Sequence, residues 1–228
     1  MKLDNPNRRL LPVLCLLLIG TGLAFVAPQP ARIVFLGANT KVAAEQGGYI
    51  GLLKEMFRAN KTNVSPELFV AGVPGDKVYD LYLRLEDEVL PKKPETVVIL
   101  TGVNDVLNKT WGNDMDLRKF ELFYRALIRK VKASGAEVVL CTPAVIGEKN
   151  DFSNPQDEDL NKYASIVLNL AQEEKCKLAD LRAVFLKHNL IHNPGNKRSG
   201  ILTTDGVRLN PAGNQLVAET IMEVLLNP

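Results

Sequence analysis

Past residue 31, short apolar runs alternate along the chain with longer segments whose apolar residues recur at helical spacing. The apolar runs, at 33–36, 68–71, 96–100, 138–141 and 177–181, are rich in Val, Ile and Leu with little polar alternation. Such runs are typical of strands that are buried on both faces of a sheet. They therefore predict five buried β-strands.

The segments between these runs predict amphipathic helices at 49–58, 77–90, 117–132 and 160–174, and a shorter helix at 181–190. The last helix is expected to begin at Asn210 and Pro211, because asparagine is a favoured N-cap residue and proline suits the first helical position. Alternating strands and helices indicate parallel strands joined by right-handed crossovers. We therefore expect an α/β fold of three layers, α/β/α, around a five-stranded parallel flavodoxin-like sheet.

Composition and charge exclude several classes of protein. The mean hydropathy of −0.01 and the 46% of hydrophobic residues fit neither a disordered chain nor a membrane protein with many spans. Of 28 basic and 26 acidic residues, residues 1–31 hold three and one, which leaves 25 of each from residue 32 onward. A neutral domain gives no reason to expect nucleic acid or an anionic membrane surface as a partner.

The N-terminus has the features of a targeting or anchoring segment. Lys2, Arg8 and Arg9 precede an apolar run over 10–27, a pattern that predicts export with the N-terminus inside. A cleaved signal peptide and a retained membrane anchor both fit this run. We therefore divide the chain into a segment of residues 1–31 and a domain of residues 32–228. The domain is expected to be periplasmic or extracellular, with membrane contact only through an uncleaved first segment.

The three cysteines do not predict a disulfide or a metal site. Cys15 lies in the N-terminal apolar run, Cys141 lies late in one predicted strand, and Cys176 lies at the start of another. In parallel neighbouring strands Cys141 and Cys176 would be separated by several residues of ~3.3 Å rise, which is beyond disulfide reach.

Small, polar, glycine-bearing segments follow four of the predicted strands, at 37–40, 71–76, 101–105 and 205–208. Ligands bind parallel α/β sheets at the carboxyl ends of the strands. We therefore expect these four segments to converge on one rim and to form the binding site.

In these segments the chain resembles the SGNH (GDSL-type) esterase and lipase family. The Gly-Val-Asn-Asp at 102–105 matches the family's Gly-x-Asn-Asp block, and 205–213 is similar to its Asp-x-x-His followed by Leu-Asn-Pro-x-Gly. The resemblance extends from about Arg32 to the C-terminus. It implies a three-layer α/β/α fold, no metal or organic cofactor, and attack by a serine on an ester through an acyl-enzyme. The implied ligand is a small-molecule ester, lipid or carbohydrate.

The resemblance also implies a role for each site position. The nucleophile falls at Asn39, the base at Arg208 and its orienting carboxylate at Asp205. The oxyanion hole would use the backbone at position 39, the Gly75 N–H and the Asn104 side chain. In such a site the base takes the proton of the serine, and the donors stabilise the developing negative charge.

Two of these positions do not carry the residue that the chemistry needs. The amide of Asn39 is not a nucleophile, and Arg208 stays protonated at physiological pH and cannot accept a proton. The family's aspartate at position 38 is Ala38, and the usual aliphatic residue at position 40 is Thr40. Because triad members act as a unit, losing both nucleophile and base leaves only a residual ~10³–10⁴-fold over water.

Two other residues, Thr40 and His192, are candidates for the missing nucleophile and the missing base. Thr40 lies one residue beyond the nucleophile position, and His192 is expected in the loop before Asp205, from which it could approach the rim. His188 is expected on the surface of the 181–190 helix. Asp105 fits a hydrogen-bond acceptor that fixes its loop better than a catalytic acid.

Arg208 itself allows two interpretations. It either forms a salt bridge with Asp205, which we favour because Asp205 otherwise loses its partner, or it forms an anion receptor with Asn39 and Asn104. Three hypotheses for function follow: a binding or scaffold protein that has lost hydrolysis, an active esterase that uses Thr40 or His192, and a nucleotide binder. The last is disfavoured because no phosphate-type glycine-rich loop follows the first strand.

Overall fold

A computed structural model of the protein describes residues 29–60, 65–110 and 112–227. The predicted N-terminal signal peptide or anchor therefore lies almost wholly outside the described residues, as does Cys15. Within the part of the chain that the structure describes, no helix combines the length and the apolar character needed to cross a membrane.

The five predicted strands form one parallel sheet. Its strands are β1 (Arg32–Gly37), β2 (Glu67–Ala71), β3 (Thr96–Leu100), β4 (Glu137–Cys141) and β5 (Lys177–Ala179), in the spatial order β2-β1-β3-β4-β5. β1 lies between β2 and β3, where Phe35 pairs with Val70 of β2 and Val98 of β3. From β1 the chain continues to β2 on one side of this strand, and it then crosses to β3 on the other side. Ligands bind such sheets where the connections change side, so the binding crevice is expected at the carboxyl end of β1.

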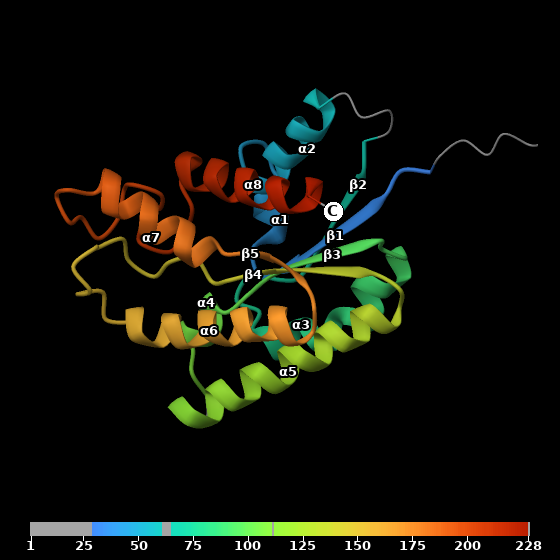
Figure 1. The fold of residues 1–228 in the computed structure, drawn as a ribbon, viewed down its shortest axis with the longest axis horizontal. Helices are drawn as coiled ribbons and strands as arrows, with labels where there is room; N and C mark the ends of the chain where they lie inside the picture. The colour runs from blue at the N-terminus through green and yellow to red at the C-terminus, as the bar shows by residue number, and fades with distance from the viewer. Residues whose placement is uncertain (1–28, 61–64, 111, 228) are drawn as a thin grey trace, which may run out of the picture.

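Helices cover both faces of this sheet, as Figure 1 shows. One face carries α1 (Thr40–Ala43), α2 (Tyr49–Ala59), α7 (Leu181–His192) and α8 (Pro211–Leu226). The other carries α3 (Val78–Arg84), α4 (Val103–Leu107), α5 (Asn113–Ala133) and α6 (Asp157–Glu173). Each layer has its own buried apolar cluster against the sheet, which confirms the predicted three-layer α/β/α fold.

The structure changes the expected extent of some elements. The helix predicted at 77–90 is α3 followed by a π-helix, η1 (Leu85–Val89), and a 3₁₀ turn, η2 (Leu90–Lys92). β5 is shorter than predicted because the side chain of Asp180 caps α7 by accepting the N–H of Ala183. The prediction that His192 lies in a loop was wrong, since α7 continues to that residue.

Two of the three cysteines, Cys141 and Cys176, lie within the described residues. Cys141 is buried at the end of β4 and Cys176 is partly buried just before β5, and neither forms a disulfide. Burial raises the pKa of the Cys141 thiol to about 12. This thiol is therefore a packed apolar group that is protonated at neutral pH.

A buried ion pair ties α6 to α7. Nη2 of Arg182 lies 2.7 Å from Oδ1 of Asp157, and both side chains are largely withdrawn from solvent. The same guanidinium donates to Asn161 and to the carbonyl of Ala144. Because removing one member of such a pair leaves the other charge buried, this contact is a sensitive point of the fold.

We predict that Arg182→Ala lowers the free energy of unfolding by about 3–5 kcal/mol, because Asp157 would be left buried and unpaired. Urea unfolding followed by circular dichroism measures this change. Lys162→Ala is the matched control, since the Lys162–Glu158 pair on α6 is exposed and its loss is expected to cost at most about 1 kcal/mol. Equal losses in the two variants would contradict the prediction.

Candidate functional site

A cleft of about 660 Å³ opens at the carboxyl ends of β1 and β3. Its walls are the segments after β1, β3 and β4, the α1–α2 connection, and the beginning of α8. This volume is in the range of sites that bind small molecules. The cleft therefore lies where the sheet topology places a ligand.

The segment after β1 contributes Asn39 and Thr40. Asn39 precedes α1, is exposed and lines the cleft. Thr40 is only 1% exposed, and its hydroxyl lies 3.1 Å from the carbonyl oxygen of Gly37 and 2.9 Å from that of Ala71. The Thr40 hydroxyl therefore joins the ends of β1 and β2 and does not point into the cleft.

The segment after β2 is held by a closed set of charged contacts. Asp76 is buried and pairs with Nε of Arg84 at 2.9 Å. Arg84 also pairs with Glu88 at 2.8 Å, and Glu88 accepts the N–H of Gly72 at 3.3 Å. The π-helix η1 carries Glu88, so this irregular turn fixes the segment that presents Gly75.

The segment after β3 contributes Asn104 and Asp105. Nδ2 of Asn104 donates to the carbonyl of Asp76 at 3.1 Å, which ties the second and third segments together. Asp105 is buried and accepts the N–H of Val78 at 3.1 Å and the hydroxyl of Thr101 at 3.3 Å. These contacts confirm that Asp105 fixes its loop by accepting hydrogen bonds. Burial raises the pKa of Asp105 to about 6.

The fourth segment is a small hairpin over residues 203–209, with Asp205 and Arg208 at its tip. An isolated antiparallel bridge joins Thr203 to Leu209, and the N–H of Thr204 donates to the carbonyl of Arg208 at 2.8 Å. One oxygen of Asp205 accepts the N–H groups of Val207 and Arg208, at 2.9 and 2.8 Å.

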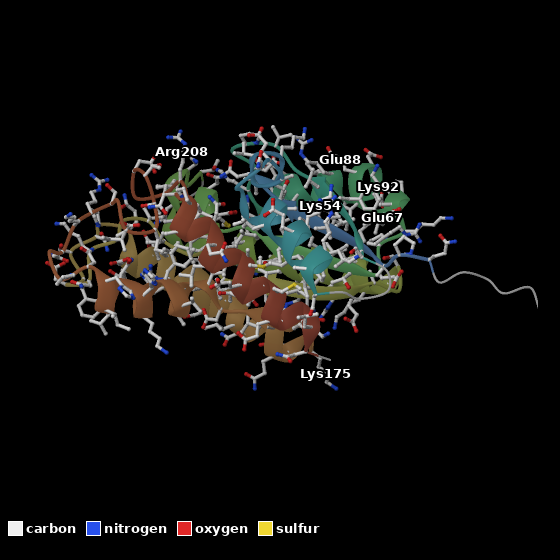
Figure 2. All side chains as sticks on the ribbon, turned by 90° about the horizontal axis from the view of Figure 1, so that it is seen from above. Lys54, Glu67, Glu88, Lys92, Lys175 and Arg208 are labelled. Carbon is white, nitrogen blue, oxygen red and sulfur yellow. The ribbon has the colours of Figure 1, made fainter. Side chains whose placement is uncertain are left out.

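The second oxygen of Asp205 lies 2.7 Å from Nη1 of Arg208, which confirms the salt bridge that the sequence favours. The backbone N–H groups of Arg208 and Val207, followed by the guanidinium charge, lower the pKa of Asp205. The Arg208 side chain is 82% exposed and extends outward from the hairpin (Figure 2). Asp205 is thus a fully engaged carboxylate and a poor base.

A buried carboxylate that sequence reasoning missed holds this hairpin in place. Glu148, in the loop after β4, is fully buried. Its two oxygens accept the N–H groups of Ile201, Leu202 and Thr203 and the hydroxyl of Thr203, at 2.6–2.9 Å. A glutamate in a polar loop is ordinarily solvated, so the sequence carries no signal for this role.

The structure brings three of the five predicted site residues into the cleft. Asn39, Asn104 and Arg208 line it. Gly75 and Asp205 do not line it but adjoin residues that do, since Gly75 precedes Asp76 and Asp205 bonds Arg208. Among the described residues, the lining contains no serine, cysteine or histidine.

The two histidines lie elsewhere. His188 and His192 are both on α7, with ring centroids 4.3 Å apart, and neither lines the cleft. His192 is therefore not placed to act as a relocated base in this structure. The α1–α2 connection at 45–48 also lines the cleft.

The fold and the cleft define a three-layer α/β/α protein with a candidate ligand site at the switch point of a parallel sheet. The sequence model of the GDSL-like Lipase/Acylhydrolase family matches residues 34–216. The chain belongs to this family.

Solved structures and relatives agree with this assignment. The crystal structure of an acetyl xylan esterase, AlAXEase, is 46% identical, with a TM-score of 0.82 over 86% of this chain and all of that chain. An acetylxylan esterase of Geobacillus stearothermophilus is 27% identical over 143 residues, which are 60% of this chain and 64% of the relative. The match thus spans less than two thirds of that relative.

The acetylxylan esterase Axe2 from Geobacillus stearothermophilus has the same fold, with a TM-score of 0.74 and 21% identity over 87% of this chain and 95% of that chain. Two other structures of Axe2 are of catalytic mutants, in which a serine or a histidine is replaced by alanine.

We predict that Asp105→Asn raises the free energy of unfolding at pH 7 by on the order of 2 kcal/mol. Between pH about 4 and the folded pKa of about 6, the unfolded chain has lost a proton that folded Asp105 keeps. The stability of the unsubstituted protein should therefore fall as pH rises through this window, and that slope should be smaller in the variant. Urea unfolding from pH 4 to 7 tests this. An identical slope in both proteins would contradict it.

Proposed function

We propose that this GDSL-family protein binds an acylated, uncharged carbohydrate in its cleft and does not hydrolyse it. The observation that carries the proposal is the Asp205–Arg208 pair. In the family pattern the aspartate orients a histidine base, whereas here its oxygens are taken by two backbone N–H groups and a guanidinium. An arginine cannot take the proton of a nucleophile.

The nucleophile position supports the same conclusion. Asn39 offers a carboxamide to the cleft, which can donate and accept hydrogen bonds but cannot form an acyl-enzyme. Thr40, the alternative nucleophile, is buried with its hydroxyl facing two carbonyl oxygens. In the described part of the chain, the lining contains two threonines, and both hydroxyls donate within the protein. The Thr101 hydroxyl donates to Asp105, and the Thr204 hydroxyl donates to the carbonyl oxygen of Arg208.

The charge distribution supports an uncharged ligand. Of the three charged residues that the described chain contributes to the lining, Asp76 and Arg208 are paired with Arg84 and Asp205, and Glu45 is exposed to solvent. The lining is otherwise rich in carboxamides, which both donate and accept hydrogen bonds and so match sugar hydroxyls and an ester carbonyl. They come from Asn39, Gln46 and Asn104, whereas the amides of Asn210 and Asn214 already donate and accept hydrogen bonds at the beginning of α8.

In this proposal the remnant of the oxyanion hole acts as a carbonyl receptor. The Asn104 amide keeps one N–H for a ligand after it donates to the Asp76 carbonyl. The Gly75 N–H belongs to the adjoining turn. The relatives suggest an acetylated xylan as the ligand class, because they are named acetylxylan esterases. An exported protein, carried out of the cell by residues 1–31, would meet such a ligand.

We predict that the protein binds an acetylated xylo-oligosaccharide and releases no acetate above background. Titration calorimetry measures binding, and an acetate assay of the same mixture measures hydrolysis. Asn104→Ala should weaken binding by roughly fivefold, because a hydrogen bond to the carbonyl contributes about 1 kcal/mol. Lys54→Ala, an exposed position on α2 outside the lining (Figure 2), is the control and should leave affinity unchanged.

Two outcomes of this experiment would contradict the proposal. The first is the absence of binding to acetylated and deacetylated oligosaccharides alike. The second is acetate release that disappears in Thr40→Val, which would favour the alternative of an active hydrolase for acyl, lysophospholipid or carbohydrate esters. Circular dichroism of each variant separates these outcomes from unfolding.

We also predict that the combined variant Ala38→Asp, Asn39→Ser and Arg208→His gains esterase activity on a short-chain p-nitrophenyl ester. The gain should be at least about 10²-fold over the parent, since serine and histidine act as a unit on a framework that supplies the remaining donors.

The matched control adds Asp205→Asn to the combined variant, and this should remove most of the gain because the imidazole would lose its orienting carboxylate. The variant without Ala38→Asp is tested in parallel, since that substitution places a carboxylate at a largely buried position. A folded combined variant with parental activity would show that the site lies elsewhere.

A further inference from the structure

The only two histidines of the 228-residue chain lie one helical turn apart at the end of α7. The ring centroids of His188 and His192 are 4.3 Å apart, and the planes are tilted by 37°. Residues separated by four positions share one face of a helix. The two rings are therefore neighbours because of the helix geometry, and the cleft plays no part in their placement.

Both imidazoles are open to solvent on the outside of the molecule. His192 is exposed and His188 is half-buried. An ion in solution can therefore reach both rings.

We propose that His188 and His192 together form a binding site for a divalent transition-metal ion such as Cu²⁺, Ni²⁺ or Zn²⁺. Two histidines at this spacing on one face of a helix are the arrangement by which helices present imidazoles to a single ion. Within the described residues no cluster of three or more His, Cys, Asp or Glu side chains is placed to hold a metal. The site thus has two protein ligands, and water fills the other positions.

The position of the pair gives metal binding a structural consequence. His192 directly precedes Asn193, which is buried and whose amide donates to the carbonyls of Glu148 and Lys197, each at 2.8 Å. An ion bound by both histidines therefore holds the last turn of α7 in place. The loop that leads to the 203–209 hairpin begins at this end of the helix. Metal should accordingly stabilise the folded protein.

The test uses the full chain with an affinity tag that contains no histidine. Titration calorimetry with each metal chloride should show one site, with Cu²⁺ bound most tightly and Mg²⁺ unbound, as nitrogen ligands dictate. Thermal unfolding should shift upward by roughly 5 °C at a Ni²⁺ concentration about a hundredfold above Kd. His188→Ala or His192→Ala alone should weaken Ni²⁺ binding by about 10²-fold, because each leaves a single ligand.

The matched control keeps two histidines but breaks their spacing. In the double variant L190H/H192A the imidazoles stand at 188 and 190, where the side chains do not face each other. Leu190 is exposed, so the exchange is expected to leave the fold intact. This variant should bind Ni²⁺ as weakly as the single alanine variants, and Lys187→Ala should bind it like the unsubstituted protein.

Two results would overturn the proposal. One is the same Ni²⁺ affinity in the unsubstituted protein and in L190H/H192A, which would mean that the spacing is irrelevant. The other is no saturable Ni²⁺ or Cu²⁺ binding by the unsubstituted protein. Both are independent of the cleft, so neither bears on the proposed carbohydrate binding.

Discussion

The geometry of the site depends on one buried carboxylate. Glu148 is fully buried and forms no salt bridge with the described residues, so its charge is stabilised by four hydrogen bonds from residues 201–203. The Thr203 hydroxyl connects Glu148 to the tip of the hairpin, since it donates to Glu148 and accepts the N–H of Gly206. A charge in this setting is costly unless every acceptor site is filled. The loop after β4 and the 203–209 hairpin are therefore fixed to each other.

The segment after β2, which contributes Asp76 to the lining of the cleft, is also fixed by ionic contacts. Asp76, Arg84 and Glu88 form a closed set that ends on the Gly72 N–H, and the π-helix supplies the last member. π-Helical turns inside helices are often found at functional sites. Gly72 has φ +117°, and a Cβ there would collide with the Gly37 carbonyl. The carboxyl ends of β1 and β2 are therefore held close together by these contacts.

The sequence predicted the parts of the molecule that follow from periodicity and from strand ends. The five strands, the three layers and the convergence of Asn39, Asn104 and Arg208 depend on local pattern and on the rules of parallel sheets, which leave few alternatives. What it missed depends on tertiary contacts. The role of Glu148 requires donors more than fifty residues away. The position of His192 was predicted wrongly because the end of α7 depends on the contacts of the Asn193 side chain with Glu148 and Lys197.

The 203–209 hairpin keeps its shape through contacts that do not depend on the side chain at position 208. The backbone N–H groups of residues 207 and 208 bind Asp205 whatever side chain stands at 208, and Glu148 holds the hairpin from behind. The guanidinium of Arg208 adds an exposed ion pair, which contributes at most about 1 kcal/mol. The shape of the hairpin is therefore set by the backbone and by Glu148. In the proposed function, the chemistry changes at two side chains, Asn39 and Arg208, while these contacts stay in place.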